Sequence, residues 1–142
     1  MNTTRPSISP TFQTPQYVLL DINRRIGPKV RPLKSGVECS PIYGFGNKLL
    51  YDKFRVSTNQ PLIPYPLVKR YLTKLIEEAG DKLLLVILDA TGPTDQEIFG
   101  VTIASVLDAQ NSGAKELVAE YRLTYDLATV TYDVDELPST GS

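Results

Sequence analysis

The sequence contains no histidine and no tryptophan, and it has a single cysteine, Cys39. Without histidine, no side chain has an ordinary pKa between roughly 5 and 8, and the usual Ser-His-Asp and Cys-His catalytic arrangements are excluded. Zinc, haem and iron–sulfur sites of the usual kinds depend on cysteine or histidine ligands, so we expect no metal and no cofactor. These absences favour a protein that binds a partner over one that catalyses a reaction.

Long apolar runs are also absent. The longest strictly apolar run, 83–88, has six residues, whereas a helix that spans a membrane needs about 20. No apolar segment of the kind found in secretory signals follows Arg5. We therefore expect no membrane span. Because a lone thiol suits a reducing compartment, we also expect a cytoplasmic location.

A chain of 142 residues, 42% of them hydrophobic, can bury one core without disulfides. The Thr-, Ser- and Pro-rich start predicts a flexible N-terminal arm at 1–15, followed by a single α+β domain at 16–136. Residues 137–142 are predicted to be a disordered tail. Within it, LPSTG at 137–141 resembles the sorting motif of sortase substrates over five residues only. Such substrates also need a secretory signal, an apolar tail and a basic end, so we favour the disordered tail.

Charge is divided between the two halves of the chain. Residues 1–75 carry 12 Lys and Arg and 3 Asp and Glu, whereas residues 76–142 carry 3 and 13. The basic half is densest at 24–34, where prolines and glycine predict a loop or irregular arm. This basic arm could pair with the acidic half inside the fold, dock on an acidic protein surface, or bind the phosphates of nucleic acid or lipid. Opposite charges also allow self-association.

Residues 57–66 hold three prolines in ten residues and predict a second loop, which carries apolar side chains. These side chains could anchor a partner or pack over the core. Together with the cations of the basic arm, they complete our set of candidate partner-binding residues: Arg24, Arg25, Lys29, Arg31, Lys34, Leu62, Ile63 and Tyr65.

The clearest helix is predicted over Pro66–Ala79. Its apolar residues recur at helical spacing from Val68 to Ala79, and Gly80 suits the position just past the end. Proline suits the first turn of a helix. We expect this main helix to cover one face of a sheet.

The remaining pattern predicts strands. Expected strands are 17–22, 42–45 and 49–56, with 82–89 as a central strand covered on both faces. Gly44, Gly46 and Asn47 are interpreted as a hairpin turn, and a phosphate-binding loop is rejected for want of a strand–loop–helix context. Residues 97–108 fit helix or strand; strand is favoured, with a hairpin loop at 109–114.

The alternation from Glu116 to Leu127 is the strongest strand pattern in the chain. The apolar phase then changes, which predicts a turn or bulge near Ala128 and Thr129. The fold expected is therefore α+β, an antiparallel meander covered by one main helix, with a strand-rich second half.

The function favoured by these features is a non-enzymatic interaction module, a regulatory or assembly adaptor that docks through its basic arm and apolar loop. One alternative is a nucleic-acid- or phosphate-binding protein that uses 24–34. A second is an enzyme that uses carboxylates, with candidates Asp89, Asp95 and Glu97 at the end of the apolar strand.

Overall fold

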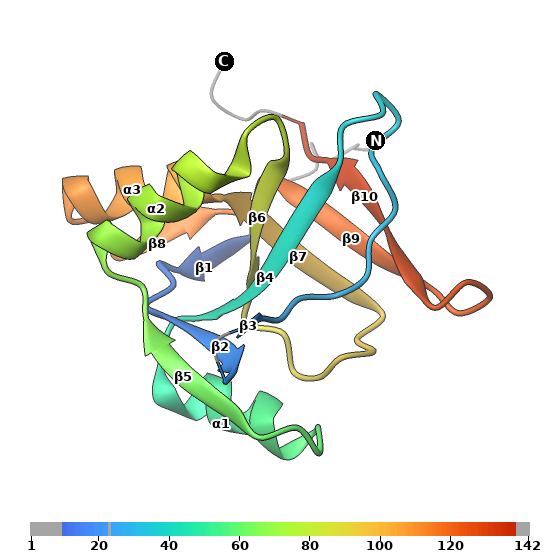
Figure 1. Ribbon diagram of the computed structural model, residues 1–142, viewed down its shortest axis with the longest axis horizontal. Helices are drawn as coiled ribbons and strands as arrows, with labels where there is room; N and C mark the ends of the chain where they lie inside the picture. Colours follow the sequence, from blue (N-terminus) through green and yellow to red (C-terminus); the bar gives the residue numbers. More distant parts are fainter. Residues whose placement is uncertain (1–9, 23, 139–142) are drawn as a thin grey trace, which may run out of the picture.

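A mostly antiparallel sheet of eight strands forms the centre of the computed structural model, which describes residues 10–22 and 24–138 (Figure 1). The strands of this sheet are β2 (Tyr17–Asp21), β3 (Arg24–Arg25), β4 (Cys39–Phe45), β5 (Leu62–Pro66), β6 (Leu83–Leu88), β7 (Glu97–Thr102), β9 (Tyr121–Asp126) and β10 (Thr131–Glu136). A separate short pair consists of β1 (Thr11–Gln13) and β8 (Glu116–Val118). The helices are α1 (Lys48–Val56), α2 (Lys69–Ala79) and α3 (Ile103–Ser112).

The strand order is β10-β9-β7-β6-β4-β2-β3, and β5 pairs with β2. Strands β4 and β6 run parallel, joined by a crossover that contains α1, β5 and α2. Strands β6, β7, β9 and β10 form an antiparallel meander. This arrangement confirms the predicted α+β class, its antiparallel meander and its strand-rich second half.

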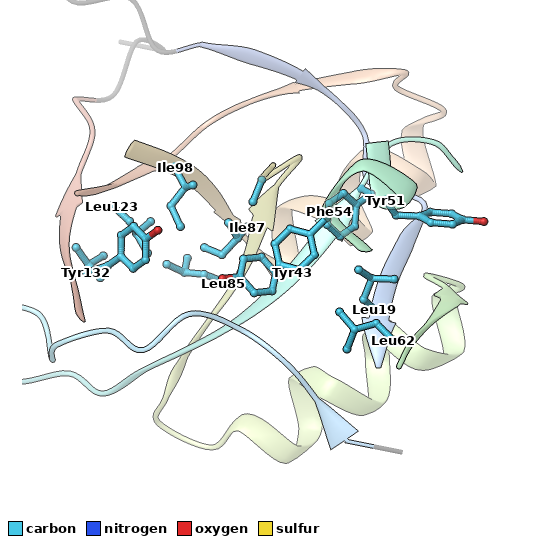
Figure 2. Packing of buried hydrophobic residues seen from close by; sticks show 13 residues of the cluster. Leu19, Tyr43, Tyr51, Phe54, Leu62, Leu85, Ile87, Ile98, Leu123 and Tyr132 are labelled. Atoms are coloured by element: carbon cyan, nitrogen blue, oxygen red, sulfur yellow. The ribbon is translucent and has the colours of Figure 1, made fainter. Parts of the chain in front are cut away.

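The sheet buries an apolar cluster on each face. On one face, Tyr51 and Phe54 of α1 pack with alternate residues of the strands. Figure 2 shows this first cluster as a band that runs from Leu123 and Tyr132 through Leu85 to the aromatic rings beside α1. On the other face, buried residues of α2 and α3 pack on the intervening strand positions. Strand β6 contributes to both clusters, which confirms the prediction of a central strand covered on both faces.

The main helix and the first strand are also confirmed. Helix α2 begins at Lys69 because Pro66 belongs to β5, and it buries Leu72 and Leu75. Gly80 follows its end with a φ of 58°, a left-handed value that glycine accepts readily. Strand β2 lies within the predicted strand 17–22.

The hairpin predicted over 42–56 is wrong, because residues 48–56 form α1 instead of a strand. The side chain of Asn47 accepts a hydrogen bond from the Leu50 N–H and caps the helix. Tyr51 and Phe54, three residues apart, both reach the first cluster. Asn47 is therefore a helix cap and not a turn residue.

The strand favoured at 97–108 is correct only to Thr102. The Thr102 hydroxyl accepts a hydrogen bond from the Ser105 N–H and starts α3, which continues to Ser112. The hairpin loop predicted at 109–114 is therefore wrong. Gly113, with a φ of 73°, ends the helix.

The long strand predicted over 116–127 is two strands. Strand β8 pairs with β1, and β9 pairs with β7 and β10. The turn predicted near Ala128 and Thr129 does join β9 to β10, and the Ala128 N–H donates to the Asp126 carboxylate. Of the predicted N-terminal arm, 11–13 form β1, and 1–9 lie outside the described residues.

The predicted loop 57–66 contains a strand, because residues 62–66 form β5. Strand β5 lies beside β2, and its prolines stand at alternate positions, 64 and 66. Proline lacks an N–H, so it is tolerated in an edge strand where that side of the backbone faces outward. The sequence signal for a loop was therefore also compatible with an edge strand.

The basic arm predicted as a loop over 24–34 begins instead with strand β3 (Arg24–Arg25). It continues as a strap, defined here as residues 26–37, that lies across the first cluster. The Tyr43 N–H donates to the Ile26 carbonyl at one end of the strap. Further along, the Tyr132 N–H donates to the Lys29 carbonyl, and the Arg31 N–H donates to the Tyr132 carbonyl. Figure 1 shows the strap passing from β3 along β10 and returning to β4. The strap thus connects β4 to the free edge of β10.

Candidate partner-binding groove

A groove of about 660 Å³ opens beside the strap. It is bordered by the strap, the end of α1, the loop between β6 and β7, and the base of the β9–β10 hairpin. Three of the candidate cations, Arg24, Arg25 and Lys29, line it together. The fold therefore brings these three predicted residues to one place.

The three cations are held only loosely by the protein itself. The Arg24 guanidinium lies 3.6 Å from an Asp21 oxygen, and the Arg25 guanidinium lies 3.6 Å from a Glu78 oxygen. Lys29 forms no ion pair within the described residues. Exposed ion pairs at such distances contribute little stability, so a carboxylate from outside can replace them at low cost.

Aromatic side chains form the floor of the groove. The rings of Tyr43 and Phe54 lie 4.5 Å apart, and those of Tyr125 and Tyr132 lie 5.0 Å apart. Tyr43, Phe54 and Tyr132 are buried, so their faces are covered by other protein atoms. These three rings therefore close the bottom of the groove, but a ligand cannot stack on their faces.

Two of these tyrosines place hydroxyl groups in the interior. The Tyr132 hydroxyl donates a 2.6 Å hydrogen bond to the Asp95 carbonyl. Burial, reinforced by Asp95 and Tyr125, raises the pKa of Tyr132 to about 12. Burial likewise raises the pKa of Tyr43, whose hydroxyl has no hydrogen-bond partner among the described residues. Both phenols stay protonated at neutral pH and can donate hydrogen bonds.

Arg31 lies outside the groove and pairs with the acidic half of the chain. Its guanidinium donates to Asp126 and to Asp133, each at 2.7 Å, and also to Thr129. The bonds to Asp126 and then Asp133 raise the pKa of Arg31, and Arg31 holds the pKa of Asp126 below its ordinary value. Of the alternatives considered for the basic arm, Arg31 therefore follows the first, because it pairs with carboxylates of the acidic half inside the fold.

Replacing Arg31 by methionine is expected to lower the unfolding free energy near neutral pH. A carboxylate whose pKa is lowered by folding stabilises the fold above its unfolded pKa of about 3.9, and that stability is lost as the pH falls through the folded value. The difference in unfolding free energy between wild type and Arg31→Met should therefore become smaller as the solution is made acidic. Urea unfolding from pH 7 downward measures it, and a gap that stays constant would contradict the role given to Asp126.

The other candidates lie elsewhere. Lys34 is exposed at the turn of the strap. Leu62 is 1% exposed and belongs to the first cluster, so it is a core residue and not a docking anchor. Ile63 and Tyr65 are exposed on β5, and the Tyr65 ring lies 4.9 Å from that of Tyr71 on α2. Neither residue lines the groove, although Ile63 and the groove cation Arg25 both pair with Leu20 of β2, from opposite sides.

The three candidate carboxylates do not converge. Asp89 accepts a hydrogen bond from the Gly46 N–H, and burial raises its pKa. Asp95 accepts two hydrogen bonds from Thr91, and Glu97 lies 3.9 Å from Arg122. Each is engaged separately, so the arrangement lends no support to a carboxylate enzyme.

A strand–loop–helix context, which the sequence did not indicate, exists where β4 passes through Gly46 into α1. However, Asp89 and Asn47 already occupy the backbone N–H groups of Gly46 and Leu50 there. The Asn47 amide also donates to the Gln13 side chain. A phosphate-binding loop is thus disfavoured for a different reason from the one the sequence suggested.

Several groove residues escaped the sequence analysis. They are Thr58, Gln60, Pro93, Thr94, Tyr125 and Val130. They come from three loops or hairpin segments far apart in the sequence, and no local pattern marks them. Their grouping follows only from the sheet order.

Cys39 is half-buried at the start of β4, and burial raises its pKa to about 11, so it is a thiol at neutral pH. Within residues 10–22 and 24–138, no group of three or more Cys, Asp or Glu side chains is arranged to hold a metal ion. No helix in this described part is long and apolar enough to cross a membrane.

Comparison with known proteins adds no relative. No protein-family model matches the chain, and neither a curated protein nor a solved structure is significantly similar to it.

Proposed function

We propose that this protein is a non-enzymatic interaction module that binds an acidic segment of another protein in the groove beside the strap. The observation that carries the proposal is the gathering of Arg24, Arg25 and Lys29 on one groove with only long ion pairs to restrain them. A regulatory or assembly adaptor in the cytoplasm is the role this suggests.

An acidic protein segment suits this groove better than nucleic acid. Nucleic-acid binding to single strands relies on aromatic faces that stack with bases, and three of the four rings in the floor are buried. The whole chain has a net charge of −1 and a pI near 5.4, whereas dedicated nucleic-acid binders are strongly basic. Phosphate binding by the same cations is the alternative that the experiment must separate.

The mechanism is electrostatic docking on a rigid support. Arg24 and Arg25 form β3 and pair with β2, so the backbone under their side chains is fixed. Lys29 is fixed by the bond from the Tyr132 N–H to its carbonyl. Complementary charge speeds association and sets specificity, and binding should weaken as salt rises.

Reversing the three groove charges in the variant Arg24→Glu, Arg25→Glu, Lys29→Glu is expected to weaken binding of a fluorescent glutamate-rich peptide by about tenfold or more, since tenfold is 1.4 kcal/mol. Three exposed charge contacts at a few tenths to 1 kcal/mol each can supply this. Fluorescence anisotropy in low salt measures it.

The matched control is Lys34→Glu, Lys74→Glu, Lys115→Glu, which changes the net charge equally at exposed positions outside the groove. This control should bind nearly as wild type does. Equal loss in both triple variants, or no binding by wild type, would overturn the proposal. If a single-stranded oligodeoxynucleotide bound more tightly than the peptide, the groove would be a phosphate-binding site instead.

A further inference from the structure

We infer that the Tyr43 hydroxyl donates a hydrogen bond to an uncharged carbonyl oxygen of the segment bound in the groove, and so helps to select that segment. This inference rests on the proposed function and adds to it a chemical requirement that the groove cations do not impose. It is carried by a buried hydroxyl group that the fold leaves without a partner.

Tyr43 is buried and yet belongs to the lining of the groove. Its side chain is 4% exposed. No other group in residues 10–22 and 24–138 forms a hydrogen bond with its hydroxyl. Buried polar groups in folded proteins nearly always have a partner, and a buried group without one costs free energy. The unpaired hydroxyl therefore marks a point at which a ligand can supply the missing acceptor.

The second buried tyrosine of the groove floor provides a comparison within the same cluster. Tyr132 is 2% exposed, and its hydroxyl donates to the Asp95 carbonyl at 2.6 Å. The two phenols thus share the same cluster and the same groove. They differ in that the fold supplies an acceptor to Tyr132 and none to Tyr43.

The groove is the opening through which an acceptor can reach the Tyr43 hydroxyl. Figure 2 shows the hydroxyl oxygen of Tyr43 on the side of its ring that is turned toward Tyr132, which also lines the groove. The faces of both rings are covered, so the hydroxyl group is the part of Tyr43 that a ligand can use. Because so little of the residue is exposed, a side chain of the ligand can reach it more easily than a length of backbone.

The surroundings of the hydroxyl favour an uncharged acceptor. Burial, reinforced by Tyr132 and Asp95, raises the pKa of Tyr43, and no groove cation counters this effect. A carboxylate placed there would be desolvated without a cation beside it, and Asp95 would repel it. A carbonyl oxygen accepts the same hydrogen bond and carries no charge. Carboxylates of the segment therefore belong at the cations, and a carbonyl oxygen belongs at the hydroxyl.

This division predicts the composition of the segment. Arg24, Arg25 and Lys29 are exposed at the border of the groove, where they can contact acidic side chains. Tyr43 lies at the bottom. An asparagine or glutamine between acidic residues would place its amide oxygen at the bottom while its neighbours stay at the border. A backbone carbonyl is the other source of the same acceptor.

Three fluorescent peptides with identical glutamate-rich flanks and Gln, Leu or Glu at the centre test the inference. Their affinities for wild type and for Tyr43→Phe form a double-mutant cycle, measured by fluorescence anisotropy at low salt. The Gln-to-Leu affinity ratio should fall about three- to tenfold in Tyr43→Phe, the range for one hydrogen bond between uncharged groups. The Glu-to-Leu ratio should hardly change. Equal weakening of all three peptides would also support the inference and assign the acceptor to the backbone.

Tyr132→Phe is the matched control, because it removes a hydroxyl that already has a partner. Its urea midpoint should fall below that of wild type, since the Asp95 carbonyl loses its donor, and its Gln-to-Leu ratio should stay that of wild type. Tyr43→Phe removes an unpaired hydroxyl, so its midpoint should equal or exceed that of wild type. The two variants are thus expected to affect stability and selection in opposite ways.

The outcomes separate this inference from the electrostatic proposal. If Tyr43→Phe leaves all three affinities unchanged, lowers the Glu-to-Leu ratio instead, or lowers the urea midpoint as Tyr132→Phe does, the inference is overturned and the proposal stands. If reversal of the three groove charges has no effect while Tyr43→Phe changes the Gln-to-Leu ratio, the proposal is overturned and the hydroxyl keeps its role. Failure of wild type to bind any of the peptides would overturn both.

Discussion

Replacing Phe54 by alanine is expected to lower the free energy of unfolding by about 3–5 kcal/mol, the range for phenylalanine truncation in a core. Phe54 is buried, and its ring lies 4.5 Å from that of Tyr43 and 5.6 Å from that of Phe45. The loss includes both transfer of the ring to water and the cavity left between α1 and the sheet. Urea unfolding monitored by circular dichroism measures it.

Leu49→Ala on the same helix is the control, because Leu49 is 81% exposed and its truncation removes little buried surface. A domain of this size is stable by about 5–15 kcal/mol, so Phe54→Ala should consume much of that margin. A stability loss below that of Leu49→Ala would mean that α1 is not anchored as described.

The second large effect is expected at Gly27, where alanine should destabilise the fold by about 1–3 kcal/mol through overpacking. A Cβ atom there would lie 2.0 Å from the carbonyl oxygen of Pro41, and a backbone atom cannot turn aside as a side chain can. The start of the strap must then move off β4. Urea unfolding gives the stability loss, and peptide anisotropy should show weaker binding because the groove cations border this segment.

Ser35→Ala, at the exposed turn of the same strap, is the comparison for Gly27→Ala. It introduces no clash, so neither stability nor peptide binding should change appreciably. If Gly27→Ala kept both properties of wild type, the close packing of strap and β4 would be refuted.

Helix α2 and strand β6 were predictable because one strong pattern governs each. The apolar spacing that ends at Gly80 has only a helical interpretation, and the six-residue apolar run at 83–88 suits a strand buried on both faces. Both patterns depend on residues within the element, and the packing of the fold agrees with them.

Helices α1 and α3 were missed because their first residues also fit a strand and their capping residues were not recognised. Asn47 and Thr102 each accept a hydrogen bond from the first turn, yet the residues after them include alternating apolar side chains that also suit a strand. A search for capping residues followed by buried pairs three apart, such as Tyr51 and Phe54, would have found α1.

The cations of the candidate site were predictable, but their division was not. In the sequence, charge density places Arg24 and Arg31 in one group. In the structure, the strap pairs with β10 so that Arg31 contacts Asp126, whereas Arg24 lines the groove. Leu62 and Ile63 are neighbours in sequence, and strand alternation buries one and exposes the other.

The closure of the strap on β10 has a consequence for the order in which the protein forms during synthesis. Arg31 bonds to Asp133, 102 positions later in the chain, and Thr14 bonds to Ala114, 100 positions later. The partners of these segments are therefore synthesised about 100 residues after the segments themselves. Until then, the first cluster is incomplete, and the apolar side chains of the strap cannot pack against it. These side chains are Ile26, Val30 and Leu33. A nascent chain should thus keep the apolar side of the strap accessible to chaperones until β10 has been synthesised and can pair with it.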